Sequence, residues 1–109
     1  MTPPAPSRGD VWFADVPLDK RRPVLVLTRD PMARILDSVI CAPVTGRVRG
    51  VGTEVMIGPE AGLDHPSVVN LDNTMLLHRA RLIHRMGRAS VDTMQAACEA
   101  LAIAVGCDG

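Results

Sequence analysis

Aromatic side chains are nearly absent from this sequence of 109 residues. It has no tyrosine, and Trp12 and Phe13 are its two aromatic residues, about 2% of the chain. Proteins that hold single-stranded nucleic acid by stacking bases need several rings on one face. Grooves for proline-rich peptides are also lined by aromatic rings. Two rings supply neither surface, so any bound nucleic acid must be held by arginine, backbone groups and small polar side chains.

Long apolar runs, a disulfide framework and an excess of charge are also missing. No stretch of about 18 apolar residues is present, so no membrane-spanning helix is expected. The first seven residues, MTPPAPS, lack the apolar core of a signal peptide. The three cysteines, Cys41, Cys98 and Cys107, are an odd and scattered set, which is typical of a reduced, cytoplasmic protein.

Charge is balanced in total but uneven along the chain. Twelve Lys and Arg residues balance twelve Asp and Glu residues, so bulk charge does not indicate a nucleic-acid or membrane binder. Residues 1–89 carry all twelve cations and nine of the acids, whereas residues 90–109 carry three acids and no cation. Eleven of the cations are arginine, whose planar fork suits phosphate. A bias in codon usage would produce the same arginine excess.

Sequence signatures of metal or nucleophilic catalysis are not found. His65, His78 and His84 have no Cys or His partner at ligand spacing, and we expect them at the surface or in turns. Cys41 lies inside an apolar run, where a buried thiol is inert. The chain has no GxSxG, HExxH, Walker or GxGxxG motif. The sequence therefore predicts no metal and no cofactor.

Short apolar runs separated by turn residues predict a mainly β fold. The N-terminal residues 1–7 are proline-rich and are predicted to be a flexible tail, followed by a single domain over residues 8–109. Turn signals such as Gly58-Pro59 and Gly62 separate the runs. Strands are predicted at 11–16, 24–28, 39–45, 53–57, 68–71 and 82–86. In the first, Val11 and Phe13 share one face, and Trp12 and Ala14 share the other.

Helical periodicity is found at the C-terminal end. Apolar residues recur there at helical spacing: Val91, Met94, Cys98, Leu101, Ala102 and Val105. Ser90 is a suitable N-cap, and Gly106 is a suitable stop. We expect this stripe to pack on the sheet or at a subunit interface. The predicted architecture is a twisted barrel or sandwich of short strands closed by one C-terminal helix.

Polar residues at strand ends are the candidates for a site. Arg21 and Arg22 precede the apolar run that begins at Pro23, and Thr45 ends the run that begins at Val39. A rigid sheet orients such side chains well. The pattern alone is equally compatible with a solvated arginine and an ordinary strand threonine.

Four segments together resemble the MazF/PemK family of toxin endoribonucleases. They are RGDVWFAD (8–15), RPVLVL (22–27), APVT (42–45) and SVVNLDN (67–73), and the resemblance covers residues 8–105. They occur in the order of the family and at compatible spacing, over essentially the whole domain. The resemblance implies an SH3-like barrel of five to seven strands with a C-terminal helix.

The same resemblance implies the function. Members of the family are homodimers that cleave single-stranded RNA at short motifs without metal, and an antitoxin encoded alongside inhibits them. The catalytic arginine of the family falls on Arg22 and its catalytic threonine on Thr45. Arg8 and Asn73 match positions that contact RNA in relatives, and Arg47 is predicted to bind RNA with them.

Two departures from the family pattern leave the cleavage motif open. The loop over residues 17–21 is shorter than in many relatives, and Met75 stands where an arginine is frequent. The alternatives are a toxin of the same barrel fold that poisons DNA gyrase, a catalytically inactive relative, and an SH3-like peptide adaptor. A gyrase poison does not need the Arg/Thr pair and ends in a Trp-Gly-Ile-like tail, which this chain lacks.

Overall fold

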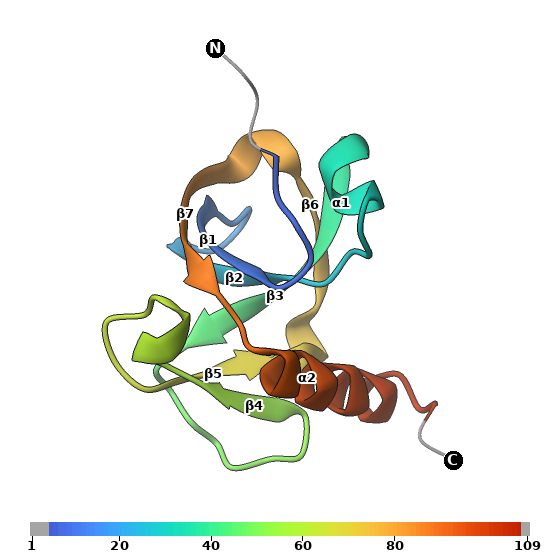
Figure 1. The fold of residues 1–109 in the computed structure, drawn as a ribbon. Helices are drawn as coiled ribbons and strands as arrows, with labels where there is room; N and C mark the ends of the chain where they lie inside the picture. The colour runs from blue at the N-terminus through green and yellow to red at the C-terminus, as the bar shows by residue number, and fades with distance from the viewer. Residues whose placement is uncertain (1–4, 108–109) are drawn as a thin grey trace.

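Seven antiparallel strands bend around two small cores and are closed by a helix in the computed structural model, which describes residues 5–107 (Figure 1). The strands are β1 (Asp10–Asp15), β2 (Arg21–Val26), β3 (Ser38–Thr45), β4 (Glu54–Ile57), β5 (Ser67–Asn70), β6 (Met75–His78) and β7 (Leu82–Arg88). The helices are α1 (Met32–Ile35) and α2 (Val91–Ala104), and short 3-10 turns are η1 (Pro59–Ala61), η2 (Leu71–Asn73) and η3 (Arg79–Arg81). The mainly β, SH3-like barrel with a C-terminal helix is confirmed.

Each of the six strands predicted by range is present, with ends that differ by a few residues. The sequence analysis predicted no strand at β6 and no helix at α1. Of the predicted tail 1–7, residues 1–4 lie outside the described residues. Pro6 is fully buried, and the Ser7 amide donates to Asp10 Oδ2 at 2.8 Å, so these two residues pack on the domain.

Strand β3 is the centre of the sheet because it pairs with three others. The strand order is β4-β5-β3-β2-β1-β7, and β6 pairs with β3 outside this path. The first half of β3 pairs with β6, up to Cys41 opposite Met75. Its end pairs with β5 instead, with Thr45 opposite Val68. Turn η2 therefore lies where one edge of β3 changes partner.

The side chains of β1 alternate between the two cores, as predicted from the sequence of this strand. Val11 belongs to the larger cluster, which also contains Leu25 and the buried face of α2. Trp12 and Ala14 belong to the smaller cluster under β3 and β6. A strand with apolar residues on both faces is buried on both sides, as expected for a small closed barrel.

Helix α2 has the predicted caps, and only part of the predicted stripe packs on the sheet. Ser90 accepts a hydrogen bond from the Thr93 amide at 3.0 Å, and Gly106 follows the helix with φ +75°. The buried positions are Ala97 and Ala100. Of the predicted stripe, Val91, Cys98 and Val105 are exposed in the single chain, so for them packing at a subunit interface stays a prediction. Small alanine side chains let the helix approach β4 and η2 closely, and the larger apolar residues fall outside this contact.

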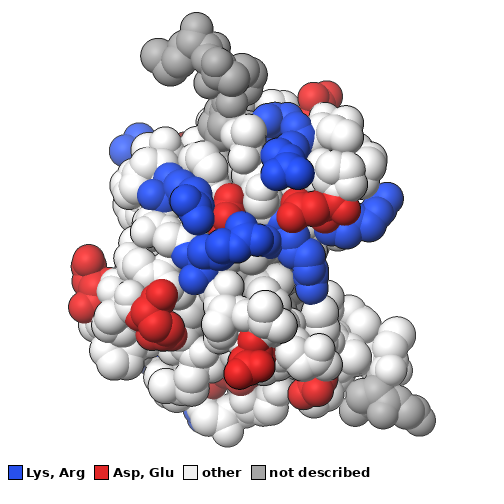
Figure 2. Space-filling view, in the orientation of Figure 1, with Lys and Arg blue, Asp and Glu red and all other residues white. Residues whose placement is uncertain are grey.

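Basic side chains gather on one part of the surface. Figure 2 shows them in a band above α2 with acidic side chains among them, and further acidic side chains over the lower half of this face. Within residues 5–107, no helix is long and apolar enough to cross a membrane.

Candidate active site

Arg22 and Thr45 come together because their strands are paired. The recorded ladder between β2 and β3 runs from Val26 opposite Cys41 to Val24 opposite Pro43. Continued by two residues, this register places Arg22 opposite Thr45. Since side chains two residues apart point to the same face of a strand, both project from the same side of the sheet. Two residues 23 positions apart are thereby brought to one place.

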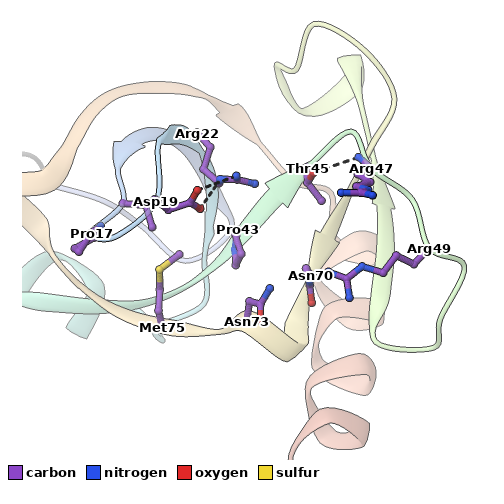
Figure 3. Close-up of a pocket in the computed structure, with 11 residues that line it drawn as sticks. Pro17, Asp19, Arg22, Pro43, Thr45, Arg47, Arg49, Asn70, Asn73 and Met75 are labelled. Atoms are coloured by element: carbon purple, nitrogen blue, oxygen red, sulfur yellow. Dashed lines mark hydrogen bonds and ion pairs between the residues drawn. The ribbon is translucent and has the colours of Figure 1, made fainter.

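This pair of residues lines two adjoining cavities. One, of about 390 Å³, also contains Asn70 and Asn73 and is called here the asparagine cavity (Figure 3). The other, of about 740 Å³, also contains His65 and His84 and is called the histidine cavity. Because Arg22 and Thr45 border both, a substrate strand that crosses from one cavity to the other passes the pair.

The guanidinium of Arg22 is held by Asp19, which lies three residues before it in the β1–β2 loop. Nη2 of Arg22 donates to Asp19 Oδ1 at 3.1 Å, and Nε lies 2.9 Å from Oδ2 (Figure 3). Nε is buried and is not aligned for a hydrogen bond with any described residue. The Arg22 side chain is only 20% exposed, so the fork is fixed by Asp19 on its Nε and Nη2 side, and Nη1 makes no hydrogen bond with a described residue.

Asp19 is ionised more readily than an ordinary aspartate. The backbone hydrogen bond from Lys20 and then the charge of Arg22 lower the pKa of its carboxyl below the usual 3.8. The loop that carries it is tight, because Leu18 adopts the left-handed region at φ +61° and the Asp19 amide donates to the Val16 carbonyl at 3.2 Å. Sequence reasoning did not select Asp19. An acidic residue in the five-residue loop just before Arg22 was the available signal.

The hydroxyl of Thr45 is oriented by the turn that follows β3. Its Oγ1 accepts a hydrogen bond from the Arg47 amide at 3.1 Å. A hydroxyl that accepts one hydrogen bond still has its own proton to donate. The Arg47 side chain is exposed and lines the asparagine cavity, as does Arg49, which sequence reasoning did not select. The cavity therefore combines a donor hydroxyl with three arginines.

Two asparagines form the wall opposite the pair. Asn70 is buried, and its Oδ1 accepts from the Asp72 amide at 3.0 Å, which caps η2. Asn73, at the end of η2, lines the same cavity together with Met75. The structure thus brings Arg22, Thr45, Arg47 and Asn73 to one cavity.

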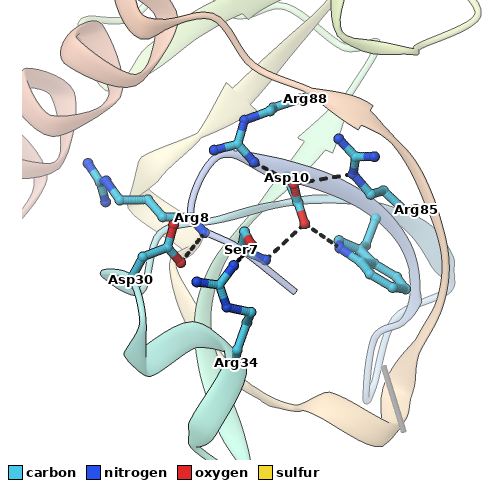
Figure 4. A network of polar contacts seen from close by, with 8 residues as sticks. Ser7, Arg8, Asp10, Asp30, Arg34, Arg85 and Arg88 are labelled. Carbon is cyan, nitrogen blue, oxygen red and sulfur yellow. Dashed lines mark hydrogen bonds and ion pairs between the residues drawn. The ribbon is translucent and has the colours of Figure 1, made fainter. Parts of the chain in front are cut away.

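Arg8 is the predicted site residue that lies elsewhere. It lines a different hollow with Asp30 and Cys98, and its guanidinium donates to the Leu27 carbonyl and to Cys98 Sγ. Figure 4 shows it beside the polar network around Asp10. The buried Asp10 carboxylate accepts from Arg88 at 2.9 Å and from Arg85 at 3.3 Å. In the described chain, Arg8 stabilises the fold at the end of β2 rather than joining the cavity of the pair.

Neither the buried cysteine nor a metal-binding cluster provides a second reactive site among the described residues. Burial raises the pKa of the Cys41 thiol to about 12, which makes it unreactive at neutral pH. Among the described residues, no three His, Cys, Asp or Glu side chains are placed to hold a metal ion together. In the histidine cavity the His84 ring stacks on Phe13, with ring centroids 5.4 Å apart.

Comparison with known proteins gives one consistent family. Residues 7–105 match the family described as "PemK-like, MazF-like toxin of type II toxin-antitoxin system". The chain is 39% identical over 103 residues to the probable endoribonuclease MazF5 of Mycobacterium tuberculosis, covering 94% of each chain. It is 41% identical over 91 residues to the endoribonuclease MazF3 of the same organism, covering 84% of this chain and 88% of that protein.

Solved structures agree with the sequence relatives. The M. tuberculosis toxin MazF-mt6 superposes with a TM-score of 0.85 at 37% identity, covering 92% of this chain and 99% of that one. A mycobacterial endoribonuclease in complex with its cognate antitoxin superposes with a TM-score of 0.83 at 30% identity, covering 94% and 96%. These likenesses extend over more than nine-tenths of this chain.

Proposed function

The chain belongs to the PemK-like, MazF-like family of type II toxins and is an endoribonuclease, and we propose that Arg22 and Thr45 are its catalytic residues. The observation that carries this proposal is that both side chains line the same two adjoining cavities, at the ends of the paired strands β2 and β3. RNA cleavage is favoured over gyrase poisoning and over peptide binding, because the sequence relatives are named endoribonucleases.

The proposed reaction uses a nucleophile that RNA itself provides. The 2′-oxygen forms a bond to the adjacent phosphorus, and the bond from phosphorus to the 5′-oxygen breaks. The products are a 2′,3′-cyclic phosphate and a 5′-hydroxyl end. No metal-bound water is required as the attacking group. The protein has to align the strand and stabilise the charge that develops on the phosphoryl oxygens.

Arg22 and Thr45 suit that task in complementary ways. The guanidinium is permanently charged, and its fork matches two oxygens of a phosphate. Its Nε and Nη2 face Asp19, whereas Nη1 makes no hydrogen bond with any described residue. The Thr45 hydroxyl, which accepts from Arg47, donates to the same oxygens. A preorganised donor of this kind contributes about 3–4 kcal/mol to the stabilisation of a transition state.

The remaining cavity residues are proposed to bind the RNA strand. Arg47 and Asn73 line the asparagine cavity beside the pair and reach phosphate and base edges respectively. Arg8, which lies in a separate hollow, is proposed to contact RNA only where the strand continues beyond the two cavities. Met75 supplies an apolar surface in place of a further cation.

The toxin is proposed to act as a cytoplasmic homodimer that is inhibited by a cognate antitoxin. A related mycobacterial endoribonuclease has been solved with its cognate antitoxin. The arginine-lined cavity of this chain is suited to acidic and apolar antitoxin residues, which would exclude RNA from the same surface.

The test is cleavage of a long single-stranded RNA by the purified protein in EDTA, followed by mapping of the ends. The wild-type protein should leave 5′-hydroxyl ends at discrete sites. Arg22→Ala and Thr45→Ala should each lower the rate about 100-fold or more. Arg29→Ala is the matched control, because Arg29 is exposed and lines none of the cavities described here. Full activity of a folded Arg22→Ala protein, or 5′-phosphate ends, would contradict the proposal.

A further inference from the structure

The three histidines of the chain occupy different settings. His78 accepts a hydrogen bond from the Ala80 amide through Nδ1 at 3.0 Å, so it caps turn η3. His84 stacks on Phe13 across the β1–β7 pair. The His65 ring makes no hydrogen bond or ion pair with any of residues 5–107. The His84 nitrogens are likewise not hydrogen-bonded among these residues, so His65 is the histidine whose ring is neither hydrogen-bonded nor stacked.

His65 lies directly against the backbone that follows Thr45. It is exposed in the loop before β5 and lines the histidine cavity with Arg22 and Thr45. A Cβ atom on Gly46 would stand 2.9 Å from His65 Nε2 and 3.5 Å from its Cδ2. The imidazole thus occupies the space that glycine leaves open, one residue from the proposed catalytic hydroxyl.

The pair alone lacks a group that can take a proton. Arg22 is effectively always protonated, and a threonine hydroxyl is not a base at neutral pH. Asp19 is already paired with Arg22, and its lowered pKa makes it a weak base. Histidine is the side chain that exchanges a proton most readily near neutral pH.

We propose that His65 is the general base of the cleavage reaction. Its neutral imidazole accepts the 2′-hydroxyl proton as the 2′-oxygen bonds to phosphorus. The bond from phosphorus to the 5′-oxygen breaks, and this oxygen takes a proton from water. The imidazolium then returns its proton to solvent. RNA accordingly lies with the scissile phosphate on the pair and the 2′-hydroxyl on the side of the histidine cavity. This proposal rests on the proposed function of Arg22 and Thr45.

The other charged and titratable groups of that cavity define the competing explanations. They are Lys20, Arg21, Arg22, Asp64, His84 and Arg85. The four cations among them are suited to phosphate binding, so their removal should weaken RNA binding at every pH. Among these groups His84 is the one that could also exchange a proton near neutral pH. It therefore has to be tested beside His65.

The first experiment measures the pH dependence of single-turnover cleavage on a long single-stranded RNA between about pH 5 and 8. His65→Asn should lower the rate at pH 7 about 100-fold or more. It should also abolish the rise of the rate with pH. His84→Asn should keep that rise, and His78→Asn, outside both cavities, should keep the wild-type rate as well. A wild-type profile in His65→Asn, or loss of the rise in His84→Asn instead, would overturn the proposal.

A second variant moves the imidazole without removing it. Gly46→Ala places a methyl group against His65 Nε2, and the imidazole, at the end of a flexible side chain, has to shift. We expect a rate loss of about tenfold or more in the wild-type background. In the His65→Asn background the same change should have little effect. An equal loss in both backgrounds would show that Gly46→Ala acts through Thr45 and would refute a role of His65.

Chemical rescue separates a catalytic imidazole from a structural one. Added imidazole should restore part of the activity of His65→Ala but none of that of Thr45→Ala. Thermal melting of each variant verifies that it is folded. If Arg22→Ala and Thr45→Ala are inactive while His65→Asn is fully active, only this inference fails. If Arg22→Ala and Thr45→Ala are fully active, the proposed function fails first.

Discussion

Two glycines hold the loop of the histidine cavity against strand β7. Gly62 ends η1 with φ +94°, and a Cβ atom there would stand 2.2 Å from the Met86 carbonyl oxygen. A Cβ atom on Gly87 would stand 2.1 Å from the Ala61 carbonyl oxygen. The two backbones therefore touch where neither residue has a side chain. We predict that Gly87→Ala is strongly destabilising.

The loss of stability expected for Gly87→Ala follows from the steric overlap of the added Cβ atom with the Ala61 backbone. A tolerable contact needs more than about 3 Å, so the 2.1 Å approach at Gly87 requires the two backbones to separate by about 1 Å. Both neighbouring atoms belong to backbone, so no side chain can rotate away. Overpacking of this kind costs about 1–3 kcal/mol, and we expect the upper end. In a domain of this size that lowers Tm by about 10–20 °C.

Urea denaturation followed by circular dichroism measures this loss, with Gly52→Ala as the matched control. A Cβ atom on Gly52 would meet nothing within 4 Å, and its φ is not in the left-handed region. Gly52→Ala should therefore be neutral or stabilising by up to about 1 kcal/mol. Equal unfolding midpoints for Gly87→Ala and Gly52→Ala would refute the argument from backbone contact.

Three further changes test separate features. Asp19→Asn should lower stability at neutral pH but not in strong acid: the pKa of the native carboxyl is lowered below 3.8, so the stabilisation from its ionised form is complete above about pH 4 and is lost as pH falls through the lowered pKa. Urea titrations of both proteins at pH 3 and pH 7 check this, and a difference that changes between pH 5 and 8 would contradict it. Cys98 and Cys107 should react with a thiol reagent at pH 8, while Cys41, with its pKa raised to about 12, should react only after unfolding. Ser90→Ala removes the cap of α2 and should cost about 1 kcal/mol in urea, and an unchanged midpoint would mean that the cap is unimportant.

The strands were predictable where both faces of the strand are apolar and turn residues mark its ends. The β2 and β3 segments are long apolar runs that end at polar residues, and both are strands. Strand β6 was not predicted because it is only four residues long. Its alternation, with Leu77 buried and Leu76 71% exposed, is too short to be recognised in the sequence. The periodicity of α2 selected its larger apolar residues, whereas close packing on β4 buries the small residues Ala97 and Ala100 most deeply.

The candidate site was predictable to the extent that it depends on the family pattern. Arg22 and Thr45 were selected from matching segments, and the pairing of their strands brings them together. Asp19 and His65 were not selected, because their importance arises from tertiary placement. A histidine between Asp64 and Pro66 has the composition of an ordinary turn. Only the approach of its ring to Gly46 relates it to the pair.

The location of the site follows from the way β3 changes partners. One edge of β3 is continuous with β2, but the other leaves β6 after Cys41 and joins β5 at Val44. Turn η2 bridges this change, and Asn73 at its end faces the asparagine cavity. The positions of Asn70, Asn73 and the Thr45 hydroxyl are thus fixed by sheet topology, whereas Asp19 and His65 lie in loops. Substitutions in the loops over residues 17–20 and 62–66 should therefore change the pH profile and the RNA motif. The pairing of β2 with β3, which carry Arg22 and Thr45 at their ends, should persist in such variants, and with it the ability to stabilise the reacting phosphate.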